Sequence, residues 1–421
     1  MIIREYQCLQ YKKDSEPNYL HVKNFGAIEK FVLENEHVAT YLKITTKKGY
    51  GKVLQAQNYV GLIQTKDGTT IEILPKIKSL SEEKTKEILI KMLKTLKNSP
   101  FKNFNKAHLK SSKLPLLEIF ISMFLEELSK LIKKGIKSDY VTKEENVKYL
   151  KGKLLINEQI KRNFIHKERF YAKFDEFLSN RIENRLIKTT LKYLYKKSKS
   201  NRNQQLIRQY LFVFDDIFTC KDIKSAFSKV KLDRQMKDYE QVLLWCKTFL
   251  LENSYSPYKG NDVAFALLFD MNMLFESYVG TYLKKELGKK ALHVKLQDKT
   301  HHLCFEEDKG RFALKPDIII KSDDELLIAD TKWKLLSQEK SNSGISGQDM
   351  YQLYAYGTKY KDCKKMYLVY PKDEEVDTKR FVYKKESDEF LVLNTLFFDM
   401  ETCAFEKNTK KEYKLLKLLY M

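Results

Sequence analysis

The sequence predicts an α+β protein of several domains, and three observations lead to this prediction. Its 421 residues exceed the usual length of one domain, so two or three domains are expected. Strand-like and helix-like patterns occupy different stretches of the chain. Basic side chains are concentrated in the middle. We therefore predict a β-rich N-terminal domain (1–80), a helical basic middle region (81–255) and a C-terminal α/β domain (256–421).

The charge of the chain indicates a polyanionic partner. Lys and Arg number 78 against 56 Asp and Glu, which gives a formal net charge of +22. Counted by predicted domain, the net charge is +4, +17 and +1 in chain order. A bias spread over the whole chain would not produce this excess in the middle, so the pattern favours a surface that follows phosphates of nucleic acid. A solvated Lys-rich helical surface is the alternative.

The first eighty residues carry strand patterns. Residues 44–53 and 58–64 are strand-like, and residues 70–74 alternate between polar and apolar side chains until Pro75. A small sheet or barrel is therefore expected at the N-terminus.

The middle region has helical periodicity. Apolar residues recur at helix spacing from residue 88 to 96 and again from 117 to 128, and Gly135 is a plausible helix stop. More helices are expected from 137 to 255. In the helix expected at 181–195, one face carries Arg181, Arg185 and Lys188, for which we predict contacts with DNA; a merely solvated face is the alternative.

Cysteine usage and hydropathy indicate a protein of the cytoplasm that does not enter a membrane. The six cysteines are scattered and form no CxxC pair, so neither a zinc site nor a disulfide is expected. The most apolar stretch, 114–128, is interrupted by Pro115 and by glutamates before it reaches the ~20 apolar residues that a membrane span needs.

Two acidic residues are predicted to meet in the C-terminal domain. Residues 318–320 and 326–329 are continuously apolar and are separated by a polar turn, which is typical of a hairpin of two buried strands. Asp317 at the start of the first strand can then lie beside Asp330 at the end of the second. A surface hairpin with a Lys/Asp ion pair is the alternative.

Lys332 completes this candidate catalytic group. It lies two residues after Asp330 on a strand, so both side chains point to the same face. Charges at the end of an apolar strand are costly unless they are paired or bind a metal. Two carboxylates with water and a phosphate oxygen suit Mg²⁺, which polarises a phosphate and acidifies a bound water. Lys332 would orient that water and offset the charge that develops on the phosphate.

Two predicted helices flank the hairpin. Glu276 borders an apolar stripe on the first, where it could supply a further metal ligand or pair with Lys332; an exposed helix glutamate is the alternative. Gln352 and Tyr356 are four residues apart on one face of the second, and we predict that they belong to the catalytic site. A tyrosine packed in the core is the alternative for Tyr356.

The order of these elements resembles a known family. A helix with Glu276, then Pro316-Asp317, Asp330-Thr331-Lys332 and Gln352-x-x-x-Tyr356 resembles the PD-(D/E)xK (restriction-endonuclease-like) nuclease fold, and within it the McrC family, the nuclease subunits of McrBC-type modification-dependent restriction systems. Residues 57–63 with 71–77, and residues 175–188, resemble the N-terminal and middle segments of that family. The second acid is Asp where many such enzymes have Glu, which shortens its reach by one methylene.

The resemblance implies a Mg²⁺-dependent DNA endonuclease that cuts double-stranded, modified (methylated) DNA in defence against foreign DNA. It implies a partner, an McrB-like AAA+ GTPase that forms a hexameric ring, with the N-terminal region docking into the ring and stimulating its hydrolysis. The run Gly49-Tyr50-Gly51-Lys52 lacks the spacing of a phosphate-binding loop, so hydrolysis is expected from the partner. A self-sufficient repair or recombination nuclease and a non-catalytic DNA-binding assembly factor are the alternatives.

Overall fold

The computed structural model describes most of the chain. The described residues are 1–12, 19–34, 40–65, 68–77, 79–97, 99–102, 114–251, 263–322, 325–372, 376–384, 390–406 and 414–420. The predicted domain boundary near residue 256 lies outside them. No helix among these residues is long and apolar enough to cross a membrane. All six cysteines are described and have free thiols.

The chain forms two compact units, which differ from the three predicted domains. Residues 1–113 and 258–421 make up the first unit, and residues 114–257 make up the second. The first unit is thus built from both ends of the chain, while the second is one continuous insertion. The N-terminal strands and the C-terminal α/β part share a unit because one strand that follows residue 256 pairs with the N-terminal sheet.

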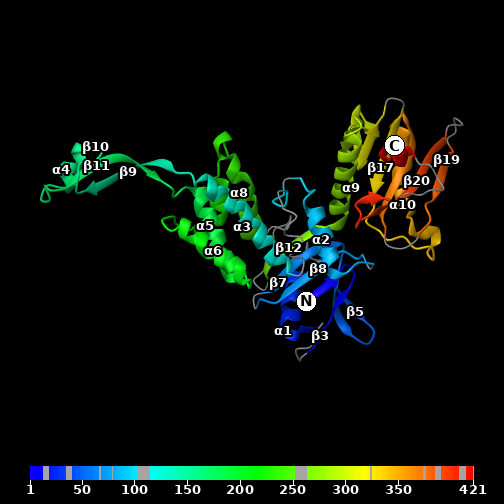
Figure 1. Cartoon of the computed structure of the whole chain (residues 1–421), viewed down its shortest axis with the longest axis horizontal. Coiled ribbons are helices and arrows are strands. Elements are labelled where there is room, and N and C mark those ends of the chain that lie inside the picture. The colour runs from blue at the N-terminus through cyan, green and yellow to red at the C-terminus, as the bar shows by residue number, and fades with distance from the viewer. Residues whose placement is uncertain are drawn as a thin grey trace. The chain divides into compact units, whose positions relative to one another are not determined.

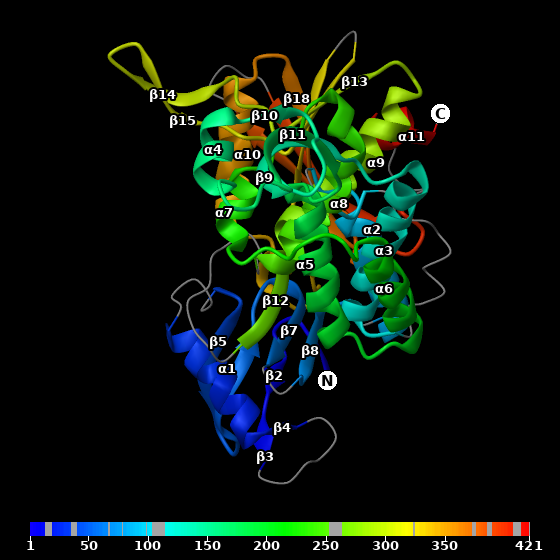
Figure 2. The same cartoon turned by 90° about the vertical axis from the view of Figure 1, so that its left-hand side faces the viewer.

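That pairing occurs in a four-stranded sheet of order β1-β8-β7-β12. Its strands are β1 (Ile2–Arg4), β7 (Tyr59–Thr65), β8 (Thr70–Leu74) and β12 (Val263–Asp270). Strands β7 and β12 run antiparallel, with Ile63 opposite Ala266, and lie side by side in Figure 2. Gly61 has a φ of +135°, and a Cβ there would clash with the carbonyl oxygen of Leu267, so only glycine permits this close approach.

Smaller elements surround this sheet. Helix α1 packs its apolar face, including Phe25 and Ile28, into the same core as Ile63 and Leu268. The remaining N-terminal elements are β2 (Cys8–Leu9), β3 (Tyr11–Lys12), β4 (Leu20–His21), α1 (Val22–Glu34), β5 (Leu42–Lys47), β6 (Gly51–Ala56) and α2 (Glu82–Leu93). The β-rich start of the chain was correctly expected from the sequence.

The C-terminal part of the first unit is a mixed sheet of order β13-β16-β17-β18-β20-β19, with β21 at β20. Strand β17 runs antiparallel to β16 and parallel to β18. The hairpin expected from the sequence is therefore present as β16 and β17. The strands of this sheet are β13 (His293–Leu296), β16 (Ile318–Lys321), β17 (Leu326–Thr331), β18 (Cys363–Pro371), β19 (Arg380–Lys384), β20 (Phe390–Asp399) and β21 (Ala404–Phe405). Strands β14 (His302–Glu306) and β15 (Lys309–Ala313) form a separate antiparallel pair.

Helices cover this sheet (Figure 1). Helix α10 buries Leu353 and Tyr356 against the sheet face that carries Ile328 and Leu368. Helix α9 contacts β13 and β17. It begins only at Met271, after an Asp270 N-cap, because residues 267–270 end β12. The helices are α9 (Met271–Gly288), the 3₁₀ turn η4 (Ser341–Gly344), α10 (Gly347–Lys359) and α11 (Lys414–Tyr420).

The second unit combines helices with a three-stranded sheet. In α3, the apolar residues expected at helix spacing are buried, and the helix ends at Gly135, whose φ of +88° few other residues adopt. Strands within 139–178 were not expected, because they alternate poorly and are mostly exposed. The elements are α3 (Leu116–Lys134), β9 (Asp139–Val147), β10 (Lys153–Leu154), α4 (Ile156–Arg162), β11 (Phe170–Leu178), α5 (Ile182–Lys197), α6 (Asn201–Val213), α7 (Ile223–Ser228), η3 (Arg234–Met236) and α8 (Lys237–Leu250).

Candidate functional site

The structure brings the two predicted aspartates together at one end of the β16–β17 hairpin. The antiparallel register pairs Ile318 with Ala329, so Asp317 and Asp330 are the next residues along the two strands. Oδ2 of Asp317 accepts hydrogen bonds from the backbone N–H and the hydroxyl of Thr331, each at 2.7 Å. Asp330 itself is almost fully buried, with 1% of its surface exposed.

Lys332 lies beside this pair and is held by helix α10. Its Nζ is 2.7 Å from Oδ2 of Asp330 and donates a hydrogen bond to Oε1 of Gln352 at 2.9 Å. Nε2 of Gln352 in turn donates to the hydroxyl of Tyr356 at 2.6 Å. Asp349, one turn earlier on α10, is 3.8 Å from the same ammonium group. The predicted Gln352 and Tyr356 therefore join one chain of contacts that ends at Lys332.

Glu276 approaches from helix α9. Its Oε1 accepts a hydrogen bond of 2.8 Å from Nε2 of Gln297, and the backbone N–H of Gln297 donates to the carbonyl oxygen of Asp317, also at 2.8 Å. Gln297 has a φ of +50° at the end of β13. This single residue thus links Glu276 to the strand end that carries Asp317, and Glu276 is not the freely exposed glutamate of the alternative interpretation.

Burial and like charge raise the pKa of all three acids. The pKa of Asp317 is raised to about 6, chiefly by burial and then by the charge of Glu276. Burial and the charge of Asp317 raise the pKa of Asp330 to about 7, although Lys332 opposes this shift. Burial also raises the pKa of Glu276, as does the charge of Asp330. The three groups therefore share one electrostatic environment in which negative charge is disfavoured.

Lys332 remains a cation in this environment. Burial by itself would lower the pKa of its ammonium group, but Asp330, with smaller effects of Asp349 and Asp317, raises it above the ordinary value. Burial and the charge of Asp330 raise the pKa of Tyr356 to about 12, so its hydroxyl keeps its proton at neutral pH. The site consequently offers one fixed positive charge beside two carboxylates.

The donor set suits a hard divalent cation, but the described residues form no closed metal cage. No group of three or more His, Cys, Asp or Glu among them has the spacing of a metal site. Oδ2 of Asp330 is nevertheless buried and accepts no well-directed hydrogen bond within the described part of the chain. Crowded carboxylate oxygens with raised pKa values are the environment that Mg²⁺ neutralises. Asp317, Asp330 and Glu276 are thus the residues that fit such an ion.

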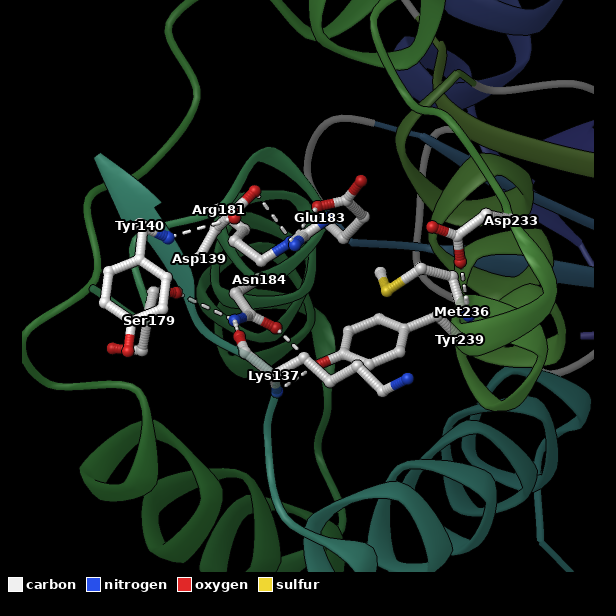
Figure 3. A network of polar contacts seen from close by, with 10 residues as sticks. All are labelled: Lys137, Asp139, Tyr140, Ser179, Arg181, Glu183, Asn184, Asp233, Met236 and Tyr239. Atoms are coloured by element: carbon white, nitrogen blue, oxygen red, sulfur yellow. Dashed lines mark hydrogen bonds and ion pairs between the residues drawn. The ribbon is translucent and has the colours of Figure 1, made fainter. Parts of the chain in front are cut away.

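Of the three basic residues predicted to contact DNA, Figure 3 shows Arg181, which lies directly before helix α5. The guanidinium of Arg181 lies 3.1 Å from Asp139 and 3.2 Å from Glu183. Lys188 is only 8% exposed and its Nζ donates to the carbonyl oxygen of Asp215 at 2.8 Å. Nε of Arg185 is also buried. Lys188 is thus buried and the two arginines are partly buried, so the three side chains do not form the freely exposed face that was expected, while their contact with DNA stays a prediction.

Several contacts around the site were missed from the sequence. Gln297, Thr331 and Asp349 all contact a predicted site residue. Thr331 directly follows Asp330 in the sequence, so a contact of its hydroxyl with the site could have been predicted from that position. Gln297 carries no comparable sequence signal, since its role depends on how β13 ends beside β16.

Comparisons with known proteins show which family the chain belongs to. The model of a family described as "McrBC 5-methylcytosine restriction system component" matches residues 54–371. The chain is 23% identical over 252 residues to the type IV methyl-directed restriction enzyme EcoKMcrBC of Escherichia coli (strain K12), covering 57% of this chain and 71% of that protein.

Solved structures share the fold. The chain is similar to one in a refined half-complex from a tetradecameric assembly of Thermococcus gammatolerans McrB AAA+ hexamers with bound McrC, with a TM-score of 0.70, 18% identity, and coverage of 100% of this chain and 98% of that one. A chain in the Thermococcus gammatolerans McrBC complex gives a TM-score of 0.52 at 20% identity, with coverage of 68% and 88%. Because the family model spans most of the sequence, the chain belongs to the family of McrBC 5-methylcytosine restriction system components.

Proposed function

We propose that the chain is the nuclease subunit of a modification-dependent restriction system, an McrC-like, Mg²⁺-dependent DNA endonuclease with a PD-(D/E)xK fold in its C-terminal part. The observation that carries this proposal is the meeting of Asp317, Asp330 and Lys332 at one end of the β16–β17 hairpin. Membership of the McrBC family supports the restriction role. A mixed sheet covered by α9 and α10 is compatible with the proposed fold.

Each residue of the site has a chemical part in this proposal. Asp317 and Asp330, with Glu276, would hold Mg²⁺, which when bound polarises the scissile phosphate and acidifies a water. Lys332 stays protonated, so it offsets charge on the phosphate and orients the water as a hydrogen-bond donor. Gln352 fixes the ammonium group of Lys332, and Tyr356 fixes Gln352. These contacts hold the cation in one place before DNA arrives.

The proposed partner is an McrB-like AAA+ GTPase that forms a hexameric ring and supplies the nucleotide hydrolysis. The solved relative is described as bound to McrB AAA+ hexamers, which supports this pairing. We keep residues 1–80 as the proposed docking region that stimulates the partner's hydrolysis. A second candidate surface lies in the second unit, where the β9–β11 sheet and α4 expose large apolar side chains. Double-stranded, methylated DNA is the proposed substrate.

The decisive experiment combines this chain with its AAA+ partner and measures Mg²⁺-dependent cutting of methylated and unmethylated DNA. Asp317→Ala, Asp330→Ala and Lys332→Ala should each lower the rate by about 1,000-fold or more while partner binding persists. Glu276→Ala and Gln352→Ala should have milder effects. Glu286→Ala is the matched control, because Glu286 is a surface residue of the same helix as Glu276 and pairs with Lys289.

The outcomes separate the proposal from its alternatives. Wild-type cutting by any of the first three variants would remove that residue from the catalytic site. Efficient cutting by this chain without a partner would favour a self-sufficient repair or recombination nuclease. Stable binding of DNA and partner with no cutting under any condition would favour a non-catalytic assembly factor.

A further inference from the structure

Trp333 connects two residues of the proposed catalytic site. It directly follows Lys332 and is 4% exposed. Its ring packs against that of Phe275, with 5.3 Å between ring centroids, and Phe275 directly precedes Glu276 on α9. The position of this one indole therefore constrains the backbone beside Lys332 and the backbone beside Glu276.

Groups from the N-terminal sheet hold this indole in place. Nε1 of Trp333 donates to both carboxylate oxygens of Glu5, at 3.1 and 3.0 Å. The backbone N–H of Lys76 donates to the same carboxylate at 3.0 Å, while Nζ of Lys76 donates to the carbonyl oxygen of Trp333 at 3.3 Å. Glu5 and Lys76 follow the parallel strands β1 and β8, whose register pairs Arg4 with Leu74. Both residues therefore lie at the same end of these two strands.

Burying the carboxylate of Glu5 costs free energy. It is only 3% exposed, and its burial raises the pKa of its carboxyl to about 7 despite the nearby Lys76 and the indole N–H. Apolar residues of similar volume often stabilise such a place at least as well as a buried charge. What a carboxylate adds is direction, since it fixes the orientation of the donor that it accepts from.

We propose that Glu5 is a positioning residue of the nuclease site: through its hydrogen bonds to Trp333 it fixes Lys332 on one side and Glu276 on the other. Lys76 supports it by holding the backbone carbonyl of Trp333. This inference rests on the proposed function and adds to it a residue from the other end of the chain. It also gives a physical role to the segment 71–77, which the catalytic site does not otherwise use.

The test measures cleavage by the complex of this chain with its AAA+ partner. Glu5→Ala and Trp333→Phe should lower kcat roughly 10-fold to 100-fold, since small displacements of reacting groups are costly, and should leave DNA affinity and partner binding unchanged. Glu5→Gln should recover part of kcat because it keeps an oxygen that accepts from the indole. Trp333→Phe keeps an aromatic ring against Phe275, while it removes the N–H donor together with part of the ring.

Ser277→Ala is the matched control. It removes a hydrogen bond of 2.7 Å from the Ser277 hydroxyl to the carbonyl oxygen of Thr95, which joins α9 to the segment after α2 without involving Trp333. It should keep the wild-type kcat. Wild-type kcat in Glu5→Ala or Trp333→Phe would overturn the proposal, and so would a fall in Ser277→Ala equal to theirs.

A second measurement does not depend on cleavage. The chain has two tryptophans, so in a Trp245→Phe background the fluorescence reports on Trp333 alone. Glu5→Ala should shift its emission maximum, whereas Ser277→Ala should not, and an unshifted spectrum in Glu5→Ala would also overturn the inference. If the wild-type complex cuts no DNA, the proposed function fails, while the fluorescence still shows whether Glu5 holds the indole.

Discussion

The two units of the molecule use their apolar residues differently. The first unit also exposes some of them, such as Phe312 and Tyr351, but buries most of them in cores, one of which combines segments from both ends of the chain. In the second unit, the β9–β11 sheet with α4 exposes many of them, and Phe164 and Ile165 are 77% and 84% exposed. The exposed set is Tyr140, Val141, Tyr149, Leu150, Ile156, Ile160, Phe164, Ile165 and Phe177. The first unit is thus suited to hold a rigid catalytic site, and the second to make contacts with another molecule.

Removing residues 1–80 should have the largest effect, because it breaks the first unit. Strand β12 would lose its partner β7, and the core around Leu268 would open. We expect the remaining chain to lose the cooperative unfolding transition of the first unit, together with all cutting. Calorimetry of the truncated protein measures this.

A matched deletion in the second unit should be tolerated. Asp139 and Leu178 are paired at the base of the β9–β11 ladder, so a short Gly-Ser loop can replace residues 140–177. The first unit should therefore need residues 1–80, whereas the second should not need residues 140–177. This difference would be contradicted if the chain without residues 1–80 still unfolded cooperatively at the wild-type temperature.

Substitution of exposed apolar residues should separate the two candidate docking surfaces. Phe164→Ser with Ile165→Ser should change the free energy of unfolding by only about 0.5 kcal/mol, since these side chains are already exposed. It should nevertheless weaken association with the AAA+ partner and slow partner-dependent cutting. The matched variant Leu33→Ser with Tyr50→Ser removes side chains that are 69% and 60% exposed within residues 1–80.

Sedimentation of each variant with the partner ranks the two surfaces. A larger loss of association in the Leu33 and Tyr50 variant would leave docking with residues 1–80, as the family resemblance implies. If both variants associate with the partner as well as the wild type does, neither patch is the docking surface.

The acids of the first unit should make its stability depend on pH. Because the pKa of Asp330 is raised in the folded protein, the folded state binds more protons than the unfolded state above the ordinary pKa of 3.8, and stability is lost as pH rises from about 4 to 7. Asp330→Asn removes this loss. Its melting temperature should therefore exceed that of the wild type more at pH 8 than at pH 5.

Thermal unfolding with and without Mg²⁺ extends this comparison. Binding of Mg²⁺ to the folded state should raise the melting temperature of the wild type at pH 8, and it should raise that of Asp330→Asn less. The same Mg²⁺ effect in both proteins would place the ion elsewhere.

The last comparison concerns helix α5 of the second unit. Lys188→Ala should lower the stability of that unit by about 1 kcal/mol, because it removes the hydrogen bond from the buried Lys188 to the carbonyl oxygen of Asp215. Lys192 and Lys196 are exposed on the same helix, so reversing them to Glu should leave stability nearly unchanged. If they contact phosphates, each should reduce the salt slope of DNA binding by about 0.9. An unchanged slope would leave this helix with a structural role only.

The sequence by itself determined the parts of the site that depend on local spacing. The two continuously apolar runs and the polar turn between them placed Asp317, Asp330 and Lys332 together at one end of a hairpin, and the four-residue spacing placed Gln352 and Tyr356 on one face of α10. These predictions needed only the periods of strands and helices, because the residues concerned lie on one element or on two adjacent strands.

Only the tertiary structure decided the contacts between distant segments. The pairing of β12 with β7, the burial of Lys188 and the bond between Glu5 and Trp333 join residues that the chain holds far apart. Local periodicity is the same whether an exposed-looking face meets water or another helix. Which of these occurs depends on packing between elements, because burial and the desolvation of charge are properties of the assembled core and not of any one segment.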